Sequence, residues 1–200
     1  MYGELFIKGI IIGLSIAAPV GPIGILCIRR TLTQGRIAGL LTGLGAATAD
    51  AIYGIIAGFG ITIITNILIA YQQEIGLVGG ILLCFLGGKT LLARPIKAQI
   101  LTRDKALAGS YFSTLLLTLT NPLTIIFFMA IFTSLNPQGV QNSLTPAILV
   151  LGVFGGSALW WLMLSLGVNF IRSIITDNFL KVINILSGTI IICFGIWSFC

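Results

Sequence analysis

The chain has 200 residues, of which 57% are hydrophobic and only 8% are charged. A soluble domain carries about 25% charged residues, so this composition excludes an ordinary water-soluble fold and indicates a membrane protein. The net charge of +6 does not indicate nucleic-acid binding, because the few cations are spread between apolar stretches and form no basic patch.

Six apolar runs follow one another along the chain, and each is close to the roughly 20 residues that one helical crossing of a bilayer needs. The runs are Leu5–Ile28, Ala38–Thr65, Ile75–Ala93, Tyr111–Thr133, Pro146–Val168 and Leu180–Phe199. They lack the alternation of barrel strands, and unpaired backbone groups are costly in lipid, so we predict helices. The expected fold is an all-α polytopic membrane protein with six transmembrane helices in a single membrane domain, residues 1–200.

Nine of the eleven basic residues lie in or beside the first, third and fifth connections. They are Arg29, Arg30, Arg36, Arg94, Lys97, Arg103, Lys105, Arg172 and Lys181. The second and fourth connections, 66–74 and 134–145, contain no Lys or Arg. Because basic loops stay in the cytoplasm, this pattern predicts an inner-membrane protein with both termini outside, on the periplasmic or extracellular face.

A long polar loop, 94–110, separates two halves, about 1–93 and 111–200, that resemble each other. Pro19 and Pro22 in the first span match Pro122 in the fourth, and glycines recur at similar depths in the other spans. With three spans per half, the second half enters the membrane from the opposite side. This pattern predicts two inverted three-helix repeats, an arrangement common in secondary transporters, with substrate held near the midplane.

Asp50 lies in the middle of the otherwise uncharged run from Ala38 to Thr65. A carboxylate at that depth costs at least about 2.5–3.5 kcal/mol and persists where it faces protein or water. We therefore interpret Asp50 as a functional group. The alternative is a buried carboxylate that only hydrogen-bonds a neighbouring helix.

Two spans carry residues that should interrupt a helix. Pro19, Gly21 and Pro22 predict a break in the first span, and the Asn121-Pro122 pair predicts one in the fourth. The alternative is a pair of kinks that only shape the bundle. Freed carbonyls, an amide and half-helix N-termini would meet Asp50 near the midplane and suit an amino acid zwitterion. The predicted substrate- and ion-binding residues are Asp50, Asn121, Pro19, Gly21, Pro22 and Pro122.

Two further residues are minor candidates. Lys89, near the cytoplasmic end of the third span, is interpreted as a side chain that reaches the interface, with a gate or substrate contact as the alternative. Trp160 lies too deep for an interfacial belt and either packs in the bundle or forms a cavity wall. Glycines four residues apart, such as Gly152 and Gly156, predict close helix contacts, which would also permit a homo-oligomer.

The sequence predicts no catalytic residues, no metal site and no cofactor. It has no histidine, and its four cysteines are widely separated, which favours packing roles over a disulfide framework or metal ligation. No nucleophile–base pair or cofactor motif indicates an enzyme.

The chain resembles the LysE family of amino acid exporters. The resemblance rests on the following elements: Pro19-Val-Gly-Pro22, Gly35 and Gly39, Gly43-Leu-Gly45 with Asp50, Gly79-Gly80, Leu86-Gly87 and the run Asn121–Phe128. It implies a six-helix carrier that exports amino acids such as lysine or arginine, driven by a proton or ion gradient. Many members have Lys after the Asn-Pro pair, whereas this chain has Leu123, and a small neutral amino acid is an equally open substrate.

Three other functions remain as alternatives. Efflux of a heavy-metal cation would want thiolate or imidazole ligands, which are sparse here. A thiol-redox membrane protein would need Cys27 and Cys84 within about 7 Å of each other at their alpha carbons. A scaffold protein would need neither broken helices nor a buried acid.

Overall fold

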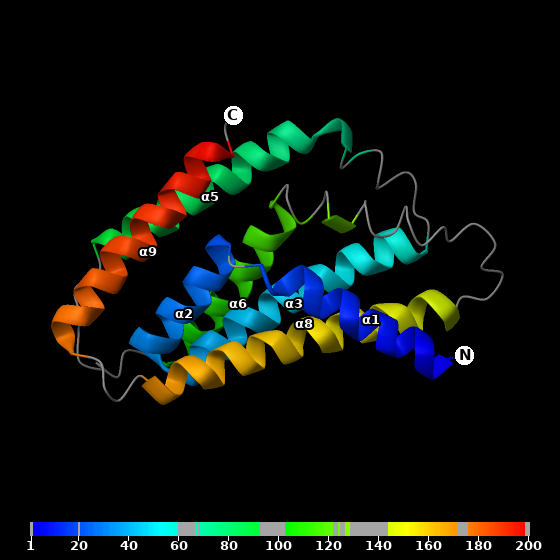
Figure 1. Ribbon diagram of the computed structural model, residues 1–200. Helices are drawn as coiled ribbons and strands as arrows, with labels where there is room; N and C mark the ends of the chain where they lie inside the picture. The colour runs from blue at the N-terminus through cyan, green and yellow to red at the C-terminus, as the bar shows by residue number, and fades with distance from the viewer. Residues whose placement is uncertain are drawn as a thin grey trace.

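The computed structural model describes residues 2–19, 21–59, 67, 69–92, 103–121, 124, 127–128, 144–171 and 176–198, with the side chains of 103–106, 171 and 177 left out. All regular structure in these residues is α-helical (Figure 1). The helices are α1 Tyr2–Ala17, α2 Pro22–Gln34, α3 Arg36–Gly58, α5 Gln72–Leu91, α6 Arg103–Leu119, α8 Leu144–Ile171 and α9 Asp177–Trp197.

Four of the described helices, α3, α5, α8 and α9, are long and apolar enough to cross a membrane. Helices α1 and α2 form a fifth such unit if they are taken together, with a bend of 83° between them. Helix α6 contributes a shorter apolar stretch, Leu107–Leu119, and begins at Arg103, inside the predicted loop 94–110. The structure therefore confirms an all-helical, polytopic membrane protein.

The break predicted in the first span is present. Helix α1 ends at Ala17 and α2 begins at Pro22, after Gly21 in an extended conformation. Proline suits the first helical position because its φ is already helical and its missing amide would be unpaired there. The two prolines thus divide one apolar run into two helices.

The helix extends beyond the approximate end that the sequence predicts for the first span, Ile28. Helix α2 continues to Gln34, so Arg29 and Arg30 lie in a helix and not in a loop. Only Gly35, with a φ of 101°, separates α2 from α3. That backbone conformation is accessible to glycine and disfavoured for other residues, so a single glycine turns the chain between the two helices.

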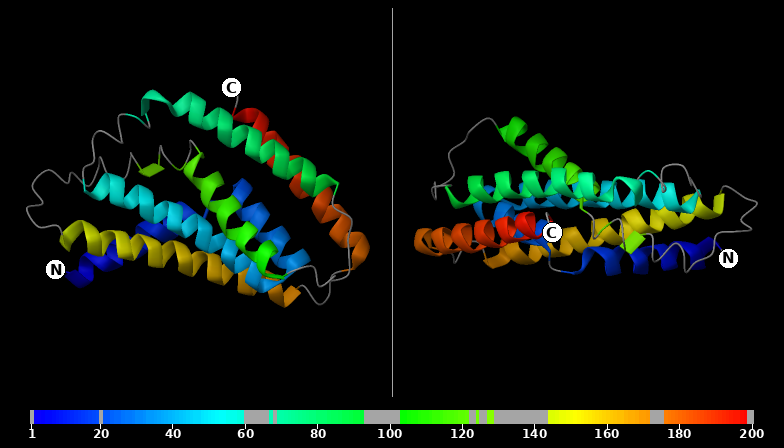
Figure 2. Two further views of the ribbon diagram at one scale, coloured as in Figure 1. Left: turned by 180° about the vertical axis from the view of Figure 1, so that it is seen from behind. Right: turned by 90° about the horizontal axis from the view of Figure 1, so that it is seen from above.

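The helices form two groups joined by a central pair. Helices α1, α3 and α8 lie side by side, and α5 and α9 pack against each other at a distance from them (Figures 1 and 2). Helices α2 and α6 lie between these groups, where α2 contacts α9, α3 and α8, and α6 contacts α3 and α5. Contacts to both groups place the start of α2 and the end of α6 in the interior of the bundle.

Glycines set the distance between α1 and α8. A Cβ added at Gly9 or Gly13 would overlap backbone atoms of α8, and one added at Gly152 or Gly156 would overlap backbone atoms of α1. Small residues at such crossings let helix backbones approach closely in membranes. The close contact predicted for the Gly152/Gly156 pair is confirmed.

The pair of α5 and α9 is built in the same way. Gly87 lies against the backbone of Gly188, and Gly195 lies against the carbonyl of Gly80. Between α3 and α8 a small residue packs against a large one, since Gly43 lies against Trp161.

Candidate functional site

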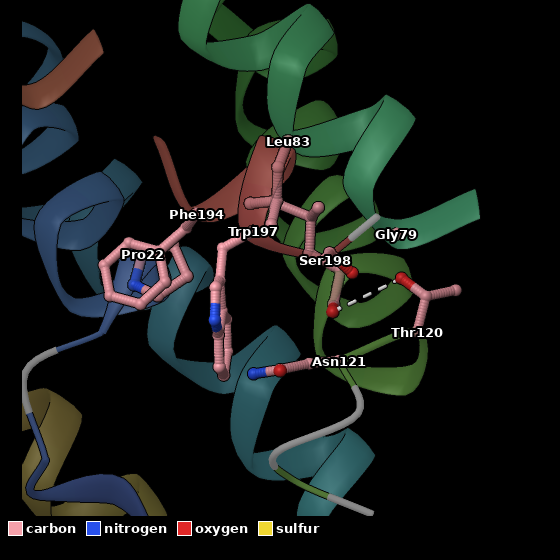
Figure 3. A pocket seen from close by; sticks show the side chains of 9 residues that line it. Pro22, Gly79, Leu83, Thr120, Asn121, Phe194, Trp197 and Ser198 are labelled. Atoms are coloured by element: carbon pink, nitrogen blue, oxygen red, sulfur yellow. Dashed lines mark hydrogen bonds between the residues drawn. The ribbon is translucent and has the colours of Figure 1, made fainter. Parts of the chain in front are cut away.

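A small cavity lies where α2, α5, α6 and α9 meet (Figure 3). Its volume is about 20 Å³, which is room for one water molecule and too little for an amino acid. The lining residues are Pro22, Gly79, Leu83, Leu117, Thr120, Asn121, Phe194, Trp197 and Ser198. The cavity in this structure is therefore too small for the expected substrate.

The two predicted helix breaks share this cavity. Pro22 begins α2, and Asn121 follows the last turn of α6, yet both line the same small space. Figure 3 shows the side chains of Asn121 and Trp197 turned toward it. Gly79 of α5 allows the approach of α6, because a Cβ there would overlap the carbonyl of Thr120. The structure thus brings the start of α2 and the residues after α6, which are far apart in the chain, to one largely apolar cavity.

Asp50 is buried against α8, with 3% of its surface exposed. Ser157 donates a hydrogen bond from its Oγ to Oδ2 of Asp50 at 2.7 Å. The indole Nε1 of Trp161 in turn donates to Ser157 Oγ at 3.2 Å. Apolar side chains surround this chain of donors, since Ala46 and Ala47 share a core cluster with Trp161. The carboxyl group is thereby fixed to α8 by a single described hydroxyl.

Ser157 was not predicted from the sequence. A single serine is common in an apolar helix, so its presence alone does not indicate a functional site. One signal was available: Asp50 follows Leu44-Gly45 by five residues from the glycine, and Ser157 follows Leu151-Gly152 at the same spacing.

Tyr53 connects the helix that carries Asp50 to the end of α6. Its hydroxyl donates to the carbonyl oxygen of Leu119 at 2.5 Å, and its ring packs against Phe128 with centroids 5.6 Å apart. Leu119 is two residues before Asn121. Asp50 itself is not among the residues that line the cavity, so the structure brings Pro22 and Asn121 together and leaves Asp50 at a separate point, against Ser157 of α8.

The other candidates lie outside the cavity lining. Pro19 is exposed, and Gly21 is half-buried as the residue before α2. Lys89 is exposed in the last turn of α5, and Trp160 is half-buried against the core cluster that contains Trp161. Pro122 lies outside the described residues.

The cysteines that the structure describes, Cys27, Cys84 and Cys193, are free thiols. Cys27 donates to the carbonyl of Gly39 at 3.4 Å, which ties α2 to α3. Among the described residues, no three His, Cys, Asp or Glu side chains form a group that could hold a metal ion.

Comparison with known proteins gives a consistent result. The family model described as "LysE type translocator" matches residues 14–198. The chain is similar to the "Putative amino acid efflux protein YcgF" of Bacillus subtilis (strain 168), with 25% identity over 97% of this chain and 94% of that protein. It is also similar to the "Uncharacterized membrane protein YahN" of Escherichia coli (strain K12), with 31% identity over 52% of this chain and 48% of that protein. No solved structure matches the chain.

Proposed function

The chain belongs to the family of LysE type translocators, and on that premise we propose that it exports amino acids across the inner membrane by alternating access. The observation that carries the proposal is the shared cavity of Pro22 and Asn121, two helix interruptions from opposite halves of the chain. In transporters built from inverted repeats, such interruptions hold the substrate at the repeat interface.

Contacts between α3 and α8 support the inverted repeat. Gly43 packs against Trp161, and Gly54 packs against Val150. If each residue of the first half corresponds to the residue 107 positions later, Gly43 corresponds to Val150 and Gly54 to Trp161. The contact of Gly43 with Trp161 is then the counterpart of the contact of Gly54 with Val150. Two antiparallel helices related by a local twofold axis would show this exchange.

The α5–α9 pair repeats the pattern with a step of 108 positions. Gly87 lies against Gly188, and Gly195 lies against Gly80. Because Gly80 corresponds to Gly188 and Gly87 to Gly195, these two contacts are counterparts of each other. Gly45 and Gly152 are also 107 positions apart: a Cβ added at Gly152 would overlap the carbonyl of Phe6 in α1, and one added at Gly45 would overlap the carbonyl of Tyr111 in α6. These contacts support an assignment of two halves, about 1–93 and 111–200, and the apolar runs and basic connections add the assignment of six spans with both termini outside.

Asp50 and Ser157 correspond to each other in this relation. They are 107 positions apart, so each is the counterpart of the other, and the hydrogen bond between them joins two equivalent positions of the two halves. Asp50 thus stands at the local axis between the halves, where relative motion of α3 and α8 would change its surroundings most directly. We assign to it the substrate ammonium group or the coupling proton.

The remaining recognition groups lie at the cavity. The amide of Asn121 can donate and accept, and the first amides of α2, after Pro22, favour an anionic group. Together with Asp50 they match a zwitterion. One carboxylate balances one ammonium group, which fits a small neutral amino acid, and a second cationic group of lysine or arginine would have to be balanced elsewhere.

The test is efflux of preloaded, labelled lysine, arginine, threonine and leucine from cells with and without this chain, each with and without a protonophore. We expect gradient-dependent loss of at least one of these amino acids in cells shown to contain the inserted protein. Absence of any efflux in such cells, together with resistance to cadmium, would overturn the amino acid proposal in favour of cation export.

A further inference from the structure

Arg30 is a buried cation in the second half of α2, with only 7% of its surface exposed. Its Nη1 donates to Thr42 Oγ1 at 3.1 Å, to the carbonyl oxygen of Ser110 at 2.9 Å and to Thr114 Oγ1 at 3.0 Å. Its Nη2 donates to Ser113 Oγ at 2.8 Å. The guanidinium therefore bridges α2 to α3 and to α6, which belongs to the other half of the chain.

All of these partners are neutral. Burying a charge without a partner of opposite sign carries a large desolvation penalty, so most buried arginines pair with an acid. Within the part of the chain whose side chains the structure describes, Arg30 forms no ion pair. Within those residues, the positive charge of Arg30 is therefore not neutralised by an acid.

The partner hydroxyls do not need Arg30. Thr42 Oγ1 donates to the carbonyl of Ala38 at 2.8 Å, and Thr114 Oγ1 donates to that of Ser110 at 2.9 Å. Each hydroxyl proton is thus satisfied within its own helix, and only a lone pair faces the guanidinium. Exchange of these neutral acceptors for a carboxylate leaves no donor unpaired and replaces ordinary hydrogen bonds by charge-assisted ones.

Arg30 also lies in line with the cavity. It is eight residues after Pro22 on α2, about 12 Å along the helix axis. Between them, Leu26 of α2, Leu117 of α6 and Ile191 of α9 form one buried apolar cluster, each less than 4% exposed. The seam between α2 and α6 therefore runs from a cation, through an apolar plug, to the largely apolar cavity that Asn121 lines.

We propose that Arg30 recognises the carboxylate of the exported amino acid at the arginine-rich end of the α2–α6 seam, before the substrate passes the plug of Leu26, Leu117 and Ile191. The proposal rests on the exporter function above and extends it to a second, entry-side contact. Arginine suits this role because its planar fork matches a carboxylate with two parallel hydrogen bonds.

Arg29 provides a matched control. It has the same charge and is next in sequence, but its Nε donates to Asn184 Oδ1 of α9 at 2.9 Å, away from the α6 hydroxyls. A general loss of positive charge in α2 would affect both arginines alike, whereas recognition of a carboxylate in the seam requires Arg30 alone.

The experiment compares an amino acid with its own carboxamide, which keeps the ammonium group and side chain but lacks the negative charge. Purified protein in lipid nanodiscs binds the labelled amino acid that the wild type exports, and the unlabelled acid or carboxamide competes. We expect wild type and Arg29→Gln to prefer the acid by at least about 10-fold, the range of a charged hydrogen bond. Arg30→Gln should lose that preference while it still binds the carboxamide with wild-type affinity.

Two results would overturn the proposal. One is an unchanged preference for the acid in Arg30→Gln, and the other is an equal loss of affinity for acid and carboxamide, which is the sign of a purely structural role. If Arg30→Gln fails to insert, Arg30→Lys takes its place: it keeps the charge but loses the planar fork, and it should show a reduced preference for the acid, whereas an unchanged preference would refute the proposal. A wild type that exports none of the amino acids would instead refute the exporter function itself.

Discussion

Ser157 of α8 donates a 2.7 Å hydrogen bond to the carboxyl group of Asp50 in α3, although the two residues are 107 positions apart in the chain. Both are buried, and Trp161 donates to Ser157 from the far side. The bond lies where the central helices of the two proposed halves cross. It couples the ionisable group to the interface that alternating access would have to rearrange.

Asp50→Asn is expected to abolish export and leave the protein inserted and folded. Asparagine has nearly the same volume and still accepts from Ser157, so packing is preserved while the charge and the exchangeable proton are lost. Gradient-dependent efflux in whole cells measures the effect, with membrane abundance as the control. Normal efflux by this variant would refute the proposed role of Asp50.

Ser157→Ala tests the hydrogen bond itself. It leaves Asp50 and the indole of Trp161 without the hydroxyl that now joins them, and a buried polar group without its partner costs about 1–3 kcal/mol. We expect a lower unfolding temperature in detergent and reduced, but not absent, efflux. A variant as stable as the wild type would show that Ser157 contributes nothing to holding the carboxyl group.

The correspondence of Asp50 and Ser157 predicts that the acid can be moved between the halves. Asp50→Ser alone should be inactive, whereas the double variant Asp50→Ser/Ser157→Asp should recover a measurable fraction of efflux, because a local twofold axis places either carboxyl group at the crossing. Ser157→Asp alone, with two adjacent acids, is the control for charge. An inserted, stable double variant with no efflux would argue against the axis.

The interruption of the first span and the close α1–α8 contact were predictable because they depend on covalent properties of proline and glycine. Ser157 and Arg30 were not. Helix α8 is apolar on all sides, so no periodicity indicates which face carries the partner of Asp50. The rule that assigns basic residues to cytoplasmic loops treats Arg30 as a loop cation, and it cannot anticipate that hydroxyls from α3 and α6 surround it.

Adjacent glycines in α8 give a sharp test of the α1–α8 contact. A Cβ at Gly156 would overlap the backbone of Ile10, whereas one at Gly155 meets nothing within 4 Å. Gly156→Ala should destabilise the protein by about 1–3 kcal/mol through forced separation of the helices. Gly155→Ala should be neutral or stabilising by up to about 1 kcal/mol, because alanine favours the helix. Thermal unfolding in detergent compares the two, and equal effects would contradict the described packing.

The orientation that we propose rests on the distribution of basic residues and has its own test. A reporter fused after residue 200 should be active on the periplasmic or extracellular side, and one inserted in the loop 94–110 should be active in the cytoplasm. The loop insertion is the internal control, because both reporters share the same protein and expression level. The six-span assignment has three crossings between the loop and the C-terminus, so a cytoplasmic signal from the C-terminal fusion would overturn it.

The apolar plug between Arg30 and the cavity predicts that export requires α2 and α6 to separate. Leu26 and Leu117 lie on these two helices in one buried cluster, so cysteines at both positions should be joined by a short thiol-specific cross-linker. The pair is placed in a chain whose native cysteines are replaced, since Cys27 is adjacent to Leu26. Cross-linking should stop efflux, and a cleavable linker should restore it on reduction. The control, Leu26→Cys alone in the same cysteine-free background, should keep its efflux in the presence of the reagent, because it offers a single thiol. Continued efflux through a fully cross-linked protein would show that the substrate takes another path.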